Sequence, residues 1–226
     1  MSVRVLYHGH SCVEIHHGPH RLQLDPYYDN NGLADVKAKD VSPTHVLLSH
    51  AHFDHTEDAE PIARRTGAPI VGNFEIETYY GKKGLKTVGI NPGGSVAFPW
   101  GRLTGTIAFH SSSFPDGTYG GEPGGYVIEV GGRTIYFAGD TALFSDMKLI
   151  GEQWNIDLAF LPIGDKYTMG PAHAVRAAEF VRAKAVVPIH YDTWPPIAQD
   201  AAAFAAALRA KGIQGLPLKP GQHHDL

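Results

Sequence analysis

Four apolar segments of this sequence each end at side chains that can bind a metal ion. The first, residues 46–55, reads VLLSHAHFDH and places three histidines and an aspartate directly after an apolar run. The other three are TIAFH, TIYFAGD and VVPIH, which end at His110, Asp140 and His190. Because loops at the carboxyl ends of strands converge in layered α/β proteins, we expect these four segments to meet around one site.

The order of apolar runs and turn residues predicts an α/β fold with two sets of strands. Three short strands at the start form a predicted meander, and a glycine-rich middle region predicts a second antiparallel set. Strands alternate with helices elsewhere, and Asn73 is the predicted N-cap of one helix. We expect strands over 3–8, 12–17, 21–25, 44–50, 67–72, 157–164 and 185–190, and helices over 54–65, 74–84, 171–184 and 198–211.

The composition excludes several classes of protein. With 226 residues, 43% of them hydrophobic and 19% charged, the chain is long enough for one domain, which we expect to span residues 1–226. A formal net charge of -4 without a basic block argues against nucleic-acid binding. No apolar run is long enough to cross a membrane and no secretion signal is visible. Cys12 is the only cysteine, so we expect a cytoplasmic protein, with homo-oligomerisation left open.

The unusual count is 14 histidines, and the residue types at the four segment ends suit a dinuclear metal centre. Two divalent ions about 3.5–4 Å apart need several imidazoles and a bridging carboxylate, and a water between them becomes hydroxide near neutral pH. Imidazole and carboxylate together suit zinc, manganese or iron better than calcium or magnesium. The candidate ligands are His50, His52, Asp54, His55, His110, Asp140 and His190.

This pattern resembles a known family. His50-Ala-His52-Phe-Asp54-His55 is similar to the HxHxDH signature of the metallo-β-lactamase superfamily. The resemblance extends to a branch of metal-dependent hydrolases related to L-ascorbate-6-phosphate lactonase. The segments that carry it run through nearly the whole chain: GHSC at 9–12, LDP at 24–26, NPGG at 91–94, HSSS at 110–113, AGDTALFSDMKLIGE at 138–152, PIGDKYTMGP at 162–171 and PIHYDTWP at 188–195.

The resemblance implies a four-layer αββα sandwich with the metals at one edge, between the sheets. It implies that one metal is held by His50, His52 and His110 and the other by Asp54, His55 and His190, with Asp140 as the bridge. Zinc is the first candidate for the two divalent ions, with manganese, iron and nickel as alternatives. It also implies that Asp25 supports the histidine loop from outside, although a plain turn aspartate before Pro26 is the alternative.

The predicted function is a hydrolase that opens an ester-type bond, a lactone or phosphoester, of a small molecule through a metal-bound hydroxide. Asp54 or Asp140 would hold the nucleophile and accept its proton, and His10 would donate a proton to the leaving group, unless His10 is only structural. The alternative is a non-catalytic metal-binding or sensing module on the same fold.

The remaining histidines lack a strand-end context, and we expect most of them at the surface or in turns, with the pair at 223–224 in a solvated tail. These are His8, His16, His17, His20, His45, His223 and His224. The glycines at 120–125 form either a mobile lid or an ordinary hairpin loop, and the sequence slightly favours the loop.

Overall fold

The first of two sheets in the computed structural model, which describes residues 2–226, contains both ends of the chain. Its strands have the order β14-β1-β2-β3-β4-β5-β6. The first three strands form an antiparallel meander, and β3 to β6 pair in parallel. The bounds are β1 (Arg4–Tyr7), β2 (Val13–His17), β3 (His20–Leu24), β4 (His45–Leu47), β5 (Ile70–Gly72), β6 (Thr87–Gly89) and β14 (His223–Asp225).

The second sheet also has seven strands, in the order β13-β12-β11-β10-β9-β8-β7. The four strands from the glycine-rich middle of the chain are antiparallel, as the sequence predicts, and β10 to β13 pair in parallel. The bounds are β7 (Ser95–Phe98), β8 (Gly101–Ile107), β9 (Gly124–Val130), β10 (Arg133–Phe137), β11 (Leu158–Pro162), β12 (Ala185–Ile189) and β13 (Gln214–Gly215).

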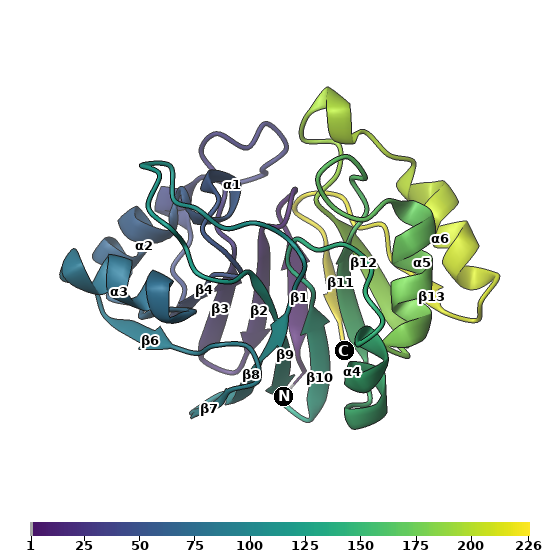
Figure 1. Cartoon of the computed structure of the whole chain (residues 1–226), viewed down its shortest axis with the longest axis horizontal. Helices are drawn as coiled ribbons and strands as arrows, with labels where there is room; N and C mark the ends of the chain where they lie inside the picture. Colours follow the sequence, from purple (N-terminus) through teal and green to yellow (C-terminus); the bar gives the residue numbers. More distant parts are fainter. Residues whose placement is uncertain (1) are drawn as a thin grey trace.

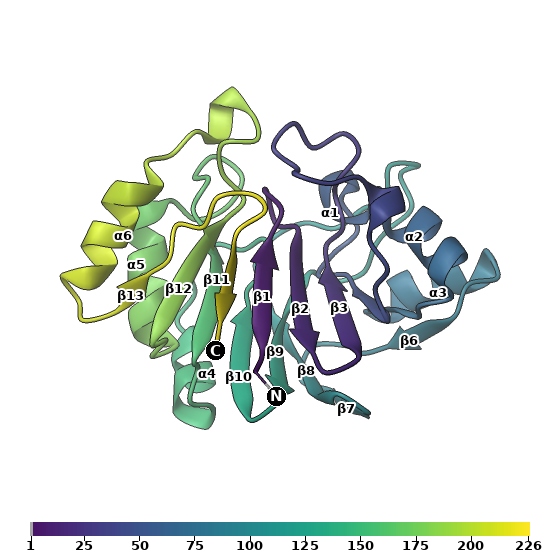
Figure 2. The ribbon, with the colours of Figure 1, turned by 180° about the vertical axis from the view of Figure 1, so that it is seen from behind.

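Helices cover the outer faces of the two sheets, which gives the four layers αββα (Figure 1). One outer layer contains α1 (Phe53–Thr56), α2 (Ala59–Thr66) and α3 (Phe74–Lys82). The other contains α4 (Met147–Gln153), α5 (Pro171–Phe180) and α6 (Ala201–Arg209). Short 3-10 helices lie at η1 (Ala38–Asp40) and η2 (Pro195–Ile197). Seen from behind, both termini lie at the edge opposite α1 (Figure 2).

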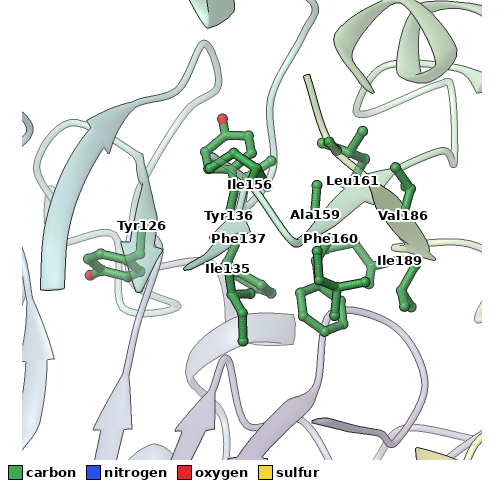
Figure 3. Packing of buried hydrophobic residues seen from close by; sticks show 14 of the residues in the cluster. Tyr126, Ile135, Tyr136, Phe137, Ile156, Ala159, Phe160, Leu161, Val186 and Ile189 are labelled. Atoms are coloured by element: carbon green, nitrogen blue, oxygen red, sulfur yellow. The ribbon is translucent and has the colours of Figure 1, made fainter. Parts of the chain in front are cut away.

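The main core lies between the sheets and extends under α4 to α6. Adjacent residues of β10 point to opposite faces, so Tyr136 and Phe137 fill different layers (Figure 3). Phe160 and Ile189 on neighbouring strands are fully buried, and burying each such side chain stabilises the fold by about 1.5–3 kcal/mol. A smaller second core lies under α1 to α3 and includes Val46, Leu48, Ile62, Ile76 and Tyr80. The strands that end at the candidate site are therefore held rigidly from both sides.

Three predicted helices differ from the structure, and the one expected over 171–184 ends earlier, at Phe180. The helix expected over 54–65 is two helices, because the carboxylate of Asp58 accepts hydrogen bonds from the amides of Tyr28 and Asp29 where the chain turns. The last helix begins at Ala201, since Asp200 caps it by accepting from the amides of Ala202 and Ala203. It ends at Arg209, before the expected Lys211.

Two predictions about histidines also need correction. His223 and His224 do not form a tail; they belong to β14, which pairs with β1. His8 is buried and contacts Glu14 and Asp35. Gly124 is the first residue of β9, and a Cβ atom at Gly120 would lie 2.3 Å from that of Ala51. Residues 108–123 thus form the loop that joins the antiparallel strands β8 and β9, which is the hairpin alternative that the sequence slightly favours.

Candidate metal centre

The seven candidate ligands come together at one edge of the two sheets. His50 and His52 follow β4, while Asp54 and His55 lie in α1. His190 directly follows β12. His110 and Asp140 come three residues after β8 and β10, so the strands end earlier than the sequence predicts. Short loops, rather than the strand ends themselves, deliver these two side chains.

Three imidazoles form one half of the centre. His50, His52 and His110 each offer a nitrogen, and these nitrogens all lie within 4.8 Å of one another. Nε2 of His50 is 3.0 Å from Nδ1 of His52. The His110 ring lies 5.1 Å from both of the other rings, centroid to centroid. This half reaches the surface, because His52 and His110 are only partly buried.

A buried group that includes a carboxylate forms the other half. Ligand atoms of Asp54, His55, His190 and His10 all lie within 4.8 Å of one another. Oδ2 of Asp54 is 3.7 Å from Nε2 of both His55 and His190. The resemblance does not include His10 among the ligands. Both of its ring nitrogens have hydrogen-bond partners, Asp54 and Thr193.

Asp140 lies between the two halves. Its Oδ2 atom is 2.9 Å from Nε2 of His190, 3.4 Å from Nε2 of His55 and 3.6 Å from Nε2 of His110. One carboxylate oxygen therefore faces nitrogens from both groups. The structure brings all seven predicted residues together, and His10 joins the group of Asp54, His55 and His190.

Asp25 supports both halves from outside. Its Oδ2 atom lies 2.7 Å from Nδ1 of His55 and accepts a 2.6 Å hydrogen bond from the Ser49 hydroxyl, while its Oδ1 accepts from the Ser49 amide at 2.8 Å. The same hydroxyl is 3.0 Å from Nδ1 of His50. Ligand imidazoles are oriented by such an acceptor on the second ring nitrogen. The supporting role of Asp25 fits these contacts, and Ser49 is a member of this network that the sequence analysis missed.

His10 is held on both ring nitrogens. Nε2 lies 2.9 Å from Oδ2 of Asp54, and Nδ1 lies 2.8 Å from Oγ1 of Thr193. Since a carboxylate only accepts, the network assigns a proton to Nε2. The Thr193 hydroxyl has two acceptors within reach, Nδ1 of His10 at 2.8 Å and the Tyr191 carbonyl oxygen at 3.4 Å, and the shorter contact favours donation to Nδ1. Thr193 was also missed, although it lies within the PIHYDTWP segment. His10 has no exposed surface.

The backbone is strained where these side chains originate. His10, Asp25 and His190 have positive φ angles of 56°, 42° and 54°. Residues other than glycine adopt this region at a cost, and such positions concentrate at functional sites. The main chain is also tied across the site, because the His190 amide donates to the His10 carbonyl oxygen at 2.8 Å. Packing thus fixes side-chain directions that relaxed turns would not provide.

The charges in the centre compensate one another. Burial alone would raise the pKa of Asp140, but His190 and His55 outweigh it and hold the pKa well below its ordinary value. Burial would also raise the pKa of Asp54, but His55 and His10 outweigh it and lower this pKa. Both carboxylates are therefore ionised at neutral pH. Burial lowers the pKa of His50 strongly, and that of His52 and His110 as well, so these three imidazoles are neutral.

Several buried atoms fit a bound metal better than an apo network. Nε2 of His55 and Oδ1 of Asp140 are buried without a hydrogen-bond partner within residues 2–226. Such groups are costly unless another partner satisfies them. Neutral imidazoles whose nitrogens face one another at 3.0 Å, as in His50 and His52, share at most one proton. Cations that accept lone pairs from nitrogen and oxygen would satisfy all of these atoms.

Comparison with known proteins agrees with this geometry. The Beta-lactamase superfamily domain matches residues 20–191. A UPF0173 metal-dependent hydrolase of Thermus thermophilus is 51% identical over 220 residues, covering 97% of each chain. Another, of Exiguobacterium sp., is 50% identical over 214 residues and covers 93% of this chain and 96% of the relative.

A solved structure extends the similarity to the whole fold. Igni18, a metallo hydrolase from the hyperthermophilic archaeon Ignicoccus hospitalis, matches with a TM-score of 0.92 and 34% identity. The match covers 100% of this chain and 99% of Igni18. Fold and site thus define a metal-dependent hydrolase. The chain belongs to the metallo-β-lactamase superfamily, as the sequence predicts. None of its helices within residues 2–226 is long and apolar enough to cross a lipid bilayer.

Proposed function

We propose that this protein uses two divalent metal ions to hydrolyse an ester-type bond, a lactone or phosphoester, in a small molecule. The observation that carries the proposal is the position of Asp140, whose Oδ2 faces His110 on one side and His55 and His190 on the other. A carboxylate between two sets of ligands is what a pair of ions needs as a bridge. Zinc is our first candidate, with manganese, iron and nickel as alternatives.

In this proposal His50, His52 and His110 hold one ion, Asp54, His55 and His190 hold the other, and Asp140 contacts both. When bound, such ions lower the pKa of a coordinated water toward 7 and polarise the oxygen of the scissile bond. Asp25 and Ser49 keep the imidazoles of His55 and His50 in the required orientation. The protein thereby supplies a rigid site that needs no reorganisation during the reaction.

The two site carboxylates have different surroundings. Asp54 is held by His10 and is slightly exposed, so it faces the reacting side and is our candidate for accepting the proton of the nucleophile. His10 acts by positioning Asp54 rather than by protonating a leaving group. Both of its ring nitrogens are engaged, one by Asp54 and one by Thr193, and its side chain has no exposed surface from which to reach a leaving group. The alternative considered from the sequence is that His10 donates a proton to the leaving group.

The test combines metal analysis with a substrate screen. Inductively coupled plasma mass spectrometry of the purified protein should find two divalent ions per chain. The protein should also hydrolyse at least one of a generic phosphodiester, lactone or thioester. Asp140→Asn should lose most of this activity, while Asp40→Asn, an exposed aspartate in η1, should retain it. If metal-loaded protein hydrolyses nothing that Asp140→Asn abolishes, the ester-hydrolase proposal is wrong.

A further inference from the structure

A cavity of about 460 Å³ opens beside the candidate metal centre. His110 forms part of its wall, so a molecule in the cavity touches one of the candidate ligands. The rest of the wall comes from the beginning of α3, the loop after β8 and the segment 119–123. This volume is within the range of small-molecule sites, which is roughly 300–1,000 Å³.

The charged side chains of this cavity are all acidic apart from His110. Glu75 and Glu122 line it, whereas no lysine or arginine does. The ion pairs of glutamates within residues 2–226 involve Glu14, Glu60 and Glu179, and so leave both cavity carboxylates without a basic partner. Glu122 accepts one hydrogen bond, from the Tyr119 hydroxyl at 2.9 Å. The cavity therefore has two carboxylates that no basic side chain neutralises.

The two asparagine side chains of the wall already form hydrogen bonds with the main chain. The Asn73 side chain donates to the carbonyl oxygens of Gly120 and Glu122 and accepts from the Ile76 amide. The Asn91 side-chain oxygen accepts from the Phe74 amide at 3.0 Å. A ligand in the cavity therefore finds its strongest polar partners in the two carboxylates.

Close packing holds the two carboxylates on the same wall. Gly121 has a φ of 76°, and a Cβ atom there would lie 2.4 Å from Oε2 of Glu75 and 2.5 Å from Nδ2 of Asn73. The 119–123 segment thus touches the first turn of α3, which contains Glu75. Glu75 is half-buried and Glu122 is exposed, so the cavity presents both carboxylates to a ligand.

The remaining wall is apolar and accessible. Phe109 and Tyr119 are 60% and 58% exposed, and Ile107 is 42% exposed. Aromatic faces attract cations, and large exposed apolar side chains that share one hollow indicate a binding site. A neighbouring cavity of about 420 Å³ shares Glu75 and Tyr119 but is also lined by Lys82 and Lys83, so of these two cavities only the one beside His110 lacks a basic side chain.

From this combination we propose that the cavity binds a positively charged ammonium group on an apolar arm of the substrate. The inference rests on the proposed function and narrows it: the ester-type bond lies at the metal centre, and the cation lies between Glu75, Glu122 and the aromatic rings. Phosphorylated or carboxylated arms are rejected by the same two carboxylates.

A pair of isosteric alcohols tests the binding step separately from any reaction. Choline and 3,3-dimethylbutanol have the same shape and differ by one charge, and a quaternary ammonium cannot coordinate a metal. Titrations of metal-loaded protein followed by NMR should show choline binding on the order of three- to tenfold more tightly. Glu75→Gln and Glu122→Gln should each reduce this preference, whereas Glu152→Gln, an exposed glutamate of α4 outside the cavity, should retain it.

The acetate esters of the same alcohols separate the two proposals. If both esters are hydrolysed with equal kcat/KM and both alcohols bind equally, the hydrolase proposal stands and the ammonium inference is wrong. If neither ester reacts and the phosphodiester, lactone and thioester screen is also negative, but choline binds preferentially and Glu75→Gln removes the preference, the ammonium inference stands and the ester-hydrolase proposal is wrong. A preference for choline that survives both Glu75→Gln and Glu122→Gln also contradicts the inference, because the cation then binds elsewhere.

Discussion

His8 and His10 are two residues apart at the end of β1, yet they belong to two different clusters. His10 contacts Asp54 in the candidate metal centre. His8 lies in what we call the ionic cluster, which consists of His8, Glu14, His16 and Asp35. Both clusters combine buried histidines with carboxylates, so composition alone cannot tell them apart.

The pairing of atoms distinguishes them. In the ionic cluster, rings and carboxylates alternate: Nδ1 of His8 is 2.7 Å from Asp35, Nε2 of His8 is 3.2 Å from Glu14, and Nε2 of His16 is 2.6 Å from Glu14. In the metal centre, imidazoles face other imidazoles, and Nε2 of His55, Oδ1 of Asp140 and Nδ1 of His190 are buried without a hydrogen-bond partner within residues 2–226. Nε2 of His8 also lacks a hydrogen bond, but the Glu14 carboxylate lies beside it. Alternating charges stabilise a fold by themselves, whereas converging lone pairs need a cation.

The largest expected effect separates the clusters by metal content. His55→Gln should remove one ligand and leave about one ion per chain, with kcat/KM on the best substrate lower by about 100- to 1000-fold. His8→Gln should keep two ions and nearly full activity, because its partners lie outside the centre. Elemental analysis and steady-state kinetics on the two variants test this. Equal metal loss in both variants would remove the distinction between the clusters.

The second effect concerns stability. Glu14→Gln leaves His8 and His16 without their shared carboxylate, and breaking a buried pair from one side costs about 3 kcal/mol of the free energy of unfolding. Urea unfolding of metal-loaded protein measures this loss. Metal content should stay at two ions per chain. If Glu14→Gln instead releases metal at unchanged stability, the ionic cluster belongs to the metal centre after all.

The sequence predicts the site better than it predicts the neighbouring cluster. The HxHxDH segment and the later segments identify all seven residues that the structure brings together, because each is fixed by a local pattern. The contact between His8 and Asp35 spans 27 residues and depends on how a loop folds back. No periodicity or motif marks such a contact. Ser49 and Thr193 were missed for a similar reason, since their hydroxyls act through the orientation of another side chain.

Element boundaries also divide into those that a local sequence pattern fixes and those that depend on a distant contact. The meander and the alternation of strands and helices follow from apolar periodicity. The break between α1 and α2 does not, because it depends on Asp58 binding amides of a distant loop. The pairing of β14 with β1 likewise depends on a contact between the two ends of the chain. Because of this pairing, His223 and His224 lie in an edge strand of the first sheet.

A third test examines how His10 is held. Thr193→Val removes the donor to Nδ1 and allows the proton to move to that nitrogen, which would leave Asp54 without its hydrogen bond. We expect kcat/KM to fall by roughly tenfold, the low end for an outer partner of a metal site, and Thr193→Ser to restore it. Nitrogen-15 chemical shifts of the His10 ring should show the change of tautomer. Unchanged shifts with reduced activity would assign Thr193 a different role.

The smallest expected effect is a pH dependence confined to the ionic cluster. Burial alone would raise the pKa of Glu14, but hydrogen bonds with His16 and His8 outweigh it and lower the pKa from 4.5 to about 2. A lowered pKa stabilises the folded state above pH 4.5, and this contribution declines as the pH falls from 4.5 toward 2. The difference in unfolding free energy between the wild-type protein and Glu14→Gln should therefore shrink by about 1 kcal/mol between pH 6 and pH 4. Metal released at low pH affects both proteins equally and cancels in this difference. If the difference in unfolding free energy stays constant between pH 6 and pH 4, the histidines do not lower the pKa of Glu14. The contrast between the two clusters would then rest on geometry alone.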